Sequence, residues 1–261
     1  MKLLDQFSFT ELMPVLSTEG MRALDKAAKE ALAKDVRQTD PPIEGETRVA
    51  IEAGYELMKQ AGAALFKKAV EVLDAYRGDA YCGDVYRRSG NAPETQIRTA
   101  PRSVAVFVGG GNNGGDGLVL AKLLIEAGIP CTTYSLAAAD KFQNEAKMAL
   151  EDFALAGGRF VMYSPVPEGL SRAETAPKSL SQAETARRMP RFAGFALAVD
   201  CMLGNGAHGE LRELYAAAVR DIAASNIPVV AADAPTGYDS QEHVRREPCT
   251  RACETLLFGF P

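Results

Sequence analysis

The sequence predicts an α/β fold in which helices cover both faces of a mostly parallel sheet. Short apolar runs alternate with stretches of helical periodicity over the second half of the 261 residues. Two of these runs lead directly into glycine-rich loops that open helices. Hydrophobic residues make up 47% and charged residues 24%, and this balance excludes disordered, collagen-like and disulfide-scaffold classes.

The N-terminal part of the chain is expected to be helical. Ser17 or Thr18 can cap a first helix, whose apolar residues recur at helical spacing as far as Leu32. A second helix is predicted from about residue 49 to residue 76, and Gly62 inside it indicates close packing. The polar residues that follow predict a loop.

The remaining elements follow in order from the apolar runs. Strands are predicted over residues 103–108, 131–136, 159–163, 195–203 and 227–232, with a last one in TLLFGF near the end. Helices are predicted over residues 118–127, 141–156 and 211–224. Two near-identical stretches, LSRAETA and LSQAETA, indicate a solvated surface insertion at about residues 165–193.

The first glycine loop, VGGGNNGGDG at residues 108–117, follows a buried strand and opens a helix. Glycines let the backbone approach a ligand, so a branched side chain at Gly115 is expected to obstruct it. The amides of the helix start favour an anion such as a diphosphate. A turn without a ligand is the alternative, although Asn112, Asn113 and Asp116 bring more polarity than a turn requires.

This loop departs from two common nucleotide-binding patterns. Gly109, Gly111 and Gly114 match G-x-G-x-x-G, but the acid expected about 20 positions later to hold a ribose is missing around Tyr134. No Gly-Lys-Ser/Thr closes a P-loop. Both departures argue against an ordinary NAD(P)-dependent oxidoreductase or a P-loop protein.

Two further apolar runs end in acids. Asp200 precedes the second glycine loop, GNGAHGE at residues 204–210, and Asp233 precedes a turn that contains Thr236. A carboxylate at the end of a buried strand needs a cation or several donors, although a helix-cap or turn role is the alternative for Asp200. Strand ends bring Asn113, Asp200 and Thr236 toward one crevice, and these oxygen donors suit a hard cation.

Charge and cysteine content exclude further classes. The net charge of −5 gives no general attraction to nucleic acid or to anionic membranes. No apolar run approaches the roughly 20 residues of a membrane helix, and the first residues lack a signal-peptide core, so a cytoplasmic protein is expected. The cysteines are expected to be reduced, and His243 with the last two of them matches no common zinc pattern. They are Cys82, Cys131, Cys201, Cys249 and Cys253.

Three of these motifs resemble the YjeF N-terminal domain, the NAD(P)H-hydrate epimerase family. The resemblance rests on GNNGGDG at 111–117, VDCMLGNGAHGE at 199–210 and ADAPTG at 232–237. LSTEGMRALDKAA at 16–28 is similar to the first helix of the family, and LMKQAG at 57–62 occupies the place of its second helical motif. The resemblance covers most of residues 14–260.

The resemblance implies a single domain over residues 1–261, folded as a three-layer α/β/α Rossmann-like sandwich. Its parts would be N-terminal helices within 14–76, a core over 103–260 and the surface insertion. The implied activity is that of an isomerase, which interconverts the R and S epimers of hydrated NADH or NADPH. A dehydratase that acts on the S epimer then restores the cofactor.

The resemblance also implies roles for individual residues. Asn113, Asp200 and Thr236 would bind potassium, and Asp233 would handle a proton or bind the hydroxyl group. His208 is a second candidate for proton transfer, because imidazole titrates near neutrality, with an exposed loop histidine as the alternative. The substrate-binding residues would be Asn112, Asn113, Gly114, Gly115, Asp116, Gly204, Asn205, Gly206, Ala207, His208, Gly209, Glu210 and Asp233.

The chain departs from the family pattern in the second helix, where Lys59 and Gln60 replace the frequent Glu-Asn pair. This change leaves open a non-catalytic ligand-binding or dimerisation module. Thr236 replaces the usual serine and keeps the hydroxyl group. Family members usually continue beyond the last apolar strand, sometimes into a dehydratase domain. We therefore expect either a longer natural chain or a homodimer that covers this strand.

Overall fold

A six-stranded, entirely parallel sheet forms the centre of the computed structural model, which describes residues 26–27, 46–75, 102–165, 191–192 and 194–258. The strand order is β3-β2-β1-β4-β5-β8. A separate antiparallel pair consists of β6, Tyr238–Asp239, and β7, Val244–Arg245. The strands of the main sheet are β1 Val104–Val108, β2 Cys131–Ser135, β3 Phe160–Met162, β4 Leu197–Cys201, β5 Val229–Ala232 and β8 Glu254–Leu256.

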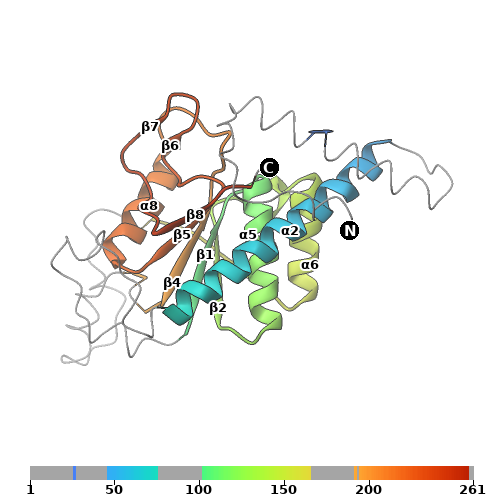
Figure 1. Ribbon diagram of the computed structural model, residues 1–261, viewed down its shortest axis with the longest axis horizontal. Coiled ribbons are helices and arrows are strands. Elements are labelled where there is room, and N and C mark those ends of the chain that lie inside the picture. The colour runs from blue at the N-terminus through green and yellow to red at the C-terminus, as the bar shows by residue number, and fades with distance from the viewer. Residues whose placement is uncertain (1–25, 28–45, 76–101, 166–190, 193, 259–261) are drawn as a thin grey trace, which may run out of the picture.

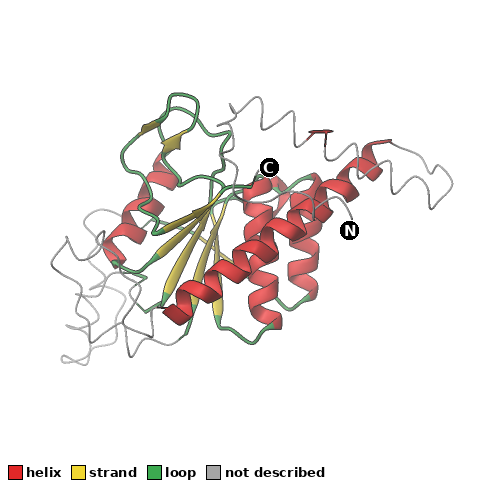
Figure 2. Cartoon of the chain, viewed as in Figure 1, coloured by secondary structure: helices red, strands yellow, loops and turns green. Residues whose placement is uncertain are grey.

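Helices cover both faces of this sheet (Figure 1; Figure 2). Among the described residues, one face carries α2, α5 and α6 and the other carries α8. The four helices are α2 Glu46–Ala75, α5 Asn112–Glu126, α6 Asn144–Leu155 and α8 Glu213–Ser225. A short 3-10 helix, η2 Ala139–Lys141, precedes α6. This arrangement confirms the predicted three-layer α/β/α sandwich with a parallel sheet.

The side chains of each strand alternate between two apolar cores. In β1, Val104, Val106 and Val108 pack with α2, α5 and α6, whereas Ala105 and Phe107 pack toward α8. All five residues of β1 and of β4 are buried. Strands that are buried on both faces need continuous apolar sequence, which is why the apolar runs located them correctly.

The largest difference from the sequence prediction concerns the start of α5. This helix begins at Asn112, six residues earlier than predicted, so most of the glycine-rich segment is helical. The last strand, β8, ends at Leu256 and is shorter than the apolar run that predicted it. The first predicted helix and the insertion lie almost entirely outside the described residues. None of the described helices has the length and apolar character needed to cross a membrane.

Candidate functional site

The carboxyl ends of β1, β4 and β5 meet at one edge of the sheet. Strand β1 lies between β2 and β4, and its chain continues through α5 toward β2, whereas β4 continues through α8 to β5. The two connections thus leave in opposite directions and on opposite faces of the sheet. Such a switch point opens a crevice beyond the strand ends, where α/β proteins bind their ligands.

The first glycine loop turns directly from β1 into α5. Gly111 is the N-terminal cap residue of α5, and no side chain caps this end of the helix. The amides of its first turn and the positive end of the helix dipole therefore remain available to a ligand or to water. Gly115 already donates its amide to the Gly111 carbonyl, at 3.1 Å.

The glycines of this loop serve packing as well as turning. A Cβ atom on Gly114 would lie 1.9 Å from the carbonyl oxygen of Gly109. A Cβ atom on Gly115 would meet Met58 of α2 at 2.6 Å and the Ala146 backbone of α6 at 3.1 Å. The missing side chain of Gly115 thus makes room for two neighbouring helices, a packing role that the sequence did not predict, while its contact with a ligand stays a prediction.

Asp200, the fourth residue of β4, is completely buried. Its Oδ1 atom accepts hydrogen bonds from the Met202 amide at 3.1 Å and from the Thr236 hydroxyl at 2.8 Å, and its Oδ2 atom accepts one from the Thr236 amide at 2.9 Å. Burial raises the pKa of Asp200, and hydrogen bonds from Thr250, Thr236 and Met202 oppose the rise. The carboxylate thus fixes the turn after β5 to the end of β4.

Oδ1 of Asn113 lies nearby, is buried and has no hydrogen-bond partner among the described residues. The other end of the Asn113 amide donates to the Ala232 carbonyl at 3.3 Å, which places Asn113 at the end of β5. The Thr250 amide donates to the Thr236 carbonyl at 2.8 Å. An unpaired oxygen beside a buried carboxylate fits a hard cation, which would satisfy the oxygen and balance the charge.

Asp233 contacts the second glycine loop at the point where that loop comes close to the first. Its Oδ2 atom accepts the Asn205 amide at 2.5 Å. A Cβ atom on Gly204 would lie 2.6 Å from this same oxygen and 3.3 Å from Cβ of Asn113. Burial raises the pKa of Asp233, a direction that suits a group that exchanges protons. Its backbone has a φ of 63°, which is rare for a residue other than glycine.

The second glycine loop borders a shallow hollow of about 220 Å³ together with the start of α8. His208 is exposed, and its Nδ1 atom lies 3.3 Å from the carbonyl oxygen of Gly206 in the same loop. The hollow is lined by the loop residues 206–210 and by Leu203, Leu211, Arg212, Tyr215, Gly237 and Tyr238. Of the predicted substrate residues in this loop, those at 206–210 line the hollow, whereas Gly204 and Asn205 do not.

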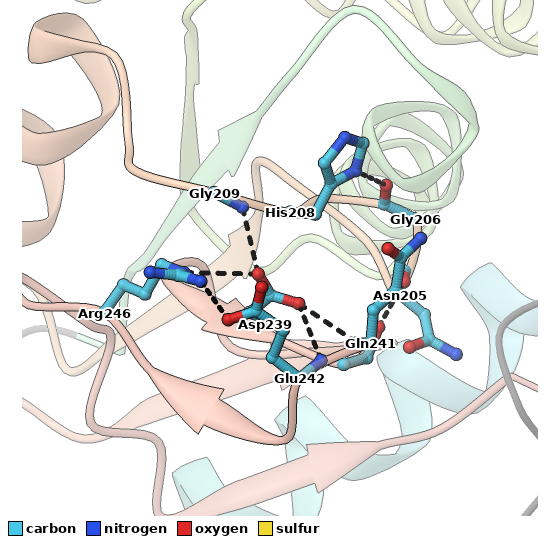
Figure 3. Close-up of polar contacts among 9 residues, drawn as sticks. Asn205, Gly206, His208, Gly209, Asp239, Gln241, Glu242 and Arg246 are labelled. Atoms are coloured by element: carbon cyan, nitrogen blue, oxygen red, sulfur yellow. Dashed lines mark hydrogen bonds and ion pairs between the residues drawn. The ribbon is translucent and has the colours of Figure 1, made fainter.

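Sequence reasoning missed the part played by the segment after the Thr236 turn. Asp239 is buried and accepts hydrogen bonds from the Gly209 amide at 3.0 Å and from the Arg246 side chain at 3.2 Å (Figure 3). These contacts connect the second glycine loop to the β6–β7 hairpin. The available signal was a second acid only six residues after Asp233, within a turn-rich segment.

The departures in the second helix lie on the surface of α2. Lys59 pairs with Glu56 at 2.6 Å and lies over the ring of Tyr55, while Gln60 is exposed. The described cysteines Cys131, Cys201, Cys249 and Cys253 are free, and Cys82 lies outside the described residues. Within the described part of the chain, no three His, Cys, Asp or Glu side chains come together as a metal cluster.

Fold and site together define an α/β protein in which a glycine-rich helix start and a buried carboxylate lie at a topological switch point. A family model described as "YjeF-related protein N-terminus" matches residues 54–261. The chain therefore belongs to the YjeF-related N-terminal domain family, as its motifs predicted.

Curated relatives carry names from one area of metabolism. An NAD(P)H-hydrate epimerase of Pirellula staleyi is 33% identical over 167 residues, which cover 64% of this chain and 66% of that protein. The bifunctional NAD(P)H-hydrate repair enzyme Nnr of Moorella thermoacetica is 30% identical over 166 residues, or 64% of this chain and 28% of that one. The chain thus spans less than two thirds of the length of these relatives.

A solved structure supports the fold. The crystal structure of the yeast protein ynu0 matches with a TM-score of 0.50 and 20% sequence identity, and the match covers 88% of this chain and 78% of the yeast chain.

Proposed function

We propose that this protein is an NAD(P)H-hydrate epimerase, an isomerase that interconverts the R and S epimers of hydrated NADH and NADPH. The observation that carries the proposal is the junction of Asn113, Gly204 and Asp233, where two glycine loops meet a carboxylate at the switch point. The family membership and the names of the relatives support the same reaction.

Each loop has a distinct part in this proposal. The uncapped start of α5 binds the diphosphate of the hydrated dinucleotide through the backbone of residues 112–116. Residues 204–210 contact the rest of the substrate. Asp233 is the group that exchanges a proton with, or accepts a hydrogen bond from, the hydroxyl on the hydrated ring, since burial keeps its carboxylate basic. His208, on the rim of the hollow, is the second candidate for this role.

Asn113, Asp200 and Thr236 would hold the potassium ion that we propose as cofactor. Asn113 offers its unpaired oxygen, and Thr236 can accept an ion at its hydroxyl while still donating to Asp200. The ion would supply a fixed positive charge. Its three ligands follow or end β1, β4 and β5. Together they would position the two glycine loops relative to one another.

The cellular setting of the activity is part of the same proposal. The protein acts in the cytoplasm, together with a dehydratase that consumes the S epimer, either as a separate protein or on a longer natural chain. Bifunctional repair enzymes among the relatives support this coupling. We also propose a homodimer, since β8 forms one edge of the described sheet.

The direct test is epimer exchange on purified R or S hydrated NADPH, followed by chromatographic separation of the two forms in potassium buffer. We expect the protein to accelerate exchange well above the spontaneous rate. Asp233→Asn should lower this acceleration by about 10²- to 10⁴-fold, the usual contribution of a general acid or base. Asp152→Asn, at a carboxylate on α6 that binds Tyr55, serves as the matched control.

The outcomes separate the candidate functions. Exchange by the wild-type protein at the spontaneous rate, with the substrate still bound in equilibrium dialysis, would indicate a non-catalytic binding module. Full activity of Asp233→Asn would remove Asp233 from the chemistry.

A further inference from the structure

Asp239, which is not among the proposed catalytic groups, is a carboxylate whose two oxygens are both fully engaged in hydrogen bonds. Its side chain is 2% exposed, and each of its oxygens accepts two hydrogen bonds (Figure 3). Oδ1 accepts the amides of Gln241 and Glu242, both at 3.1 Å, which closes the turn between β6 and β7. Oδ2 accepts the Gly209 amide at 3.0 Å and Nε of Arg246 at 3.2 Å.

The second glycine loop is therefore held by both of its ends. At its start, Asn205 donates its amide to Asp233 and receives the Ser240 hydroxyl on its carbonyl, at 2.5 Å for each bond. At its end, Gly209 donates to Asp239 with a φ of 75°, a conformation that L side chains rarely adopt. Apart from Asp233, which follows β5, the anchoring residues Asp239 and Ser240 come from the β6–β7 segment.

We propose that Asp239 is a positioning residue that holds the loop of residues 204–210 in the shape that binds the hydrated dinucleotide. This inference rests on the proposed function. Asp239 touches no reacting atom, and it acts through the Gly209 amide while Arg246 balances its charge.

The environment of Asp239 favours its charged form at neutral pH. Hydrogen bonds from the Gly209 and Glu242 amides, and then from Arg246, lower the pKa of Asp239 to about 2. Arg246 also pairs with Glu242, so the cation is itself held in place by the hairpin. An ionised acceptor forms a stronger bond to the Gly209 amide than a neutral one would.

A purely structural role would require the hairpin to support the core, but its side chains do not. Both residues of β7 are exposed, and neither β6 nor β7 contributes a side chain to the two apolar cores. The hairpin projects beyond the main sheet next to α8 (Figure 1). Loss of the hydrogen bond between Gly209 and Asp239 should therefore change the conformation of the loop more than it lowers the stability of the fold.

Asp239→Asn separates the two halves of this network. An asparagine can keep Oδ1 toward the Gln241 and Glu242 amides, but its NH2 group would then face Gly209 and Arg246, which are donors themselves. The variant should retain the turn between β6 and β7 and lose the hydrogen bond to Gly209 of the second glycine loop. Asp152→Asn again serves as control, because Asp152 likewise accepts hydrogen bonds from a cationic side chain, Lys122, and from a neutral donor, the Tyr55 hydroxyl, but lies on α6, across the sheet from α8.

Two measurements test the proposal. In hydrogen-exchange mass spectrometry without substrate, Asp239→Asn should speed exchange in peptides that cover residues 204–210 and leave exchange of β1 unchanged, whereas Asp152→Asn should leave the loop unchanged. In the epimer assay, Asp239→Asn should raise KM or lower kcat/KM by about 10- to 100-fold, as misplaced binding groups do. The melting temperature should fall no further than that of Asp152→Asn.

The two proposals fail separately. An inactive wild-type protein would refute the epimerase, while the exchange of residues 204–210 would still decide whether Asp239 orders the loop. Unchanged exchange of the loop in Asp239→Asn would overturn the positioning role. So would kinetic constants equal to those of the active wild-type protein, or a loss of activity that merely follows global unfolding.

Discussion

At the scale of single residues, the unusual feature of the site is a completely buried carboxylate that pairs with no cationic side chain among the described residues. Asp200 accepts hydrogen bonds from Met202, Thr236 and Thr250, yet burial still raises its pKa. A bound monovalent cation would compensate the negative charge of Asp200 and satisfy Oδ1 of Asn113 at the same time. The charge of Asp200 then becomes a requirement for ion binding.

Asp200→Asn should abolish stabilisation by potassium. If potassium is present at about 100 times its dissociation constant, binding adds about 2.7 kcal/mol to the free energy of unfolding. For a chain of this size, this is a rise of roughly 5–10 °C in melting temperature. Differential scanning fluorimetry in potassium and in tetramethylammonium chloride measures the difference, which Asp152→Asn should retain. Identical wild-type melting in both salts would argue against the ion.

At the scale of elements, the first glycine loop and α5 form one packing unit. Gly114 contacts Gly109, Gly115 contacts α2 and α6, and Gly117 leaves room for Cys201 of β4. Gly111 differs, because a Cβ atom there would meet nothing within 4 Å. The same glycine-rich sequence therefore contains positions fixed by packing and one position that is open to solvent.

Alanine substitutions at these glycines should differ sharply in their effect on stability. Gly114→Ala places a Cβ atom 1.9 Å from a backbone carbonyl that has no room to move, and we expect a loss of about 3 kcal/mol or more. Gly111→Ala, in extended backbone at φ −98°, should stay within about 0.5 kcal/mol of wild type. Chemical denaturation measures both. Equal stability of the two variants would contradict this assignment of the glycines.

The sequence predicted the sheet well and the start of α5 poorly, for a physical reason. Buried parallel strands require continuous apolar runs, so β1, β4 and β5 were visible. Glycine and asparagine have low helix propensity, which concealed the start of α5 at Asn112 until packing with α2 and α6 became visible. Asp200 and Asp233 stood out against apolar neighbours, whereas Asp239 lies among polar turn residues and only its tertiary contacts distinguish it.

At the scale of the whole molecule, burial decreases from the centre of the sheet to its edges. Strands β1 and β4 are buried at all five positions, and the two apolar cores meet across them. At the outer strands of the described sheet, β3 exposes Val161 and Met162, and no residue of β8 is fully buried. The site lies over the central strands, where the framework is most strongly supported.

Native-state hydrogen exchange should follow this gradient. Amides of β1 and β4 can exchange only when both cores open, so their exchange should report global unfolding. Amides of β3 and β8 should exchange faster, because an outer strand can separate after losing few apolar contacts. Mass spectrometry of peptides that cover residues 104–108 and 254–256 compares the two. Protection of β8 equal to that of β1, and dependent on protein concentration, would instead show that a second copy covers this edge. The site would then lie in an assembly rather than in an independent domain.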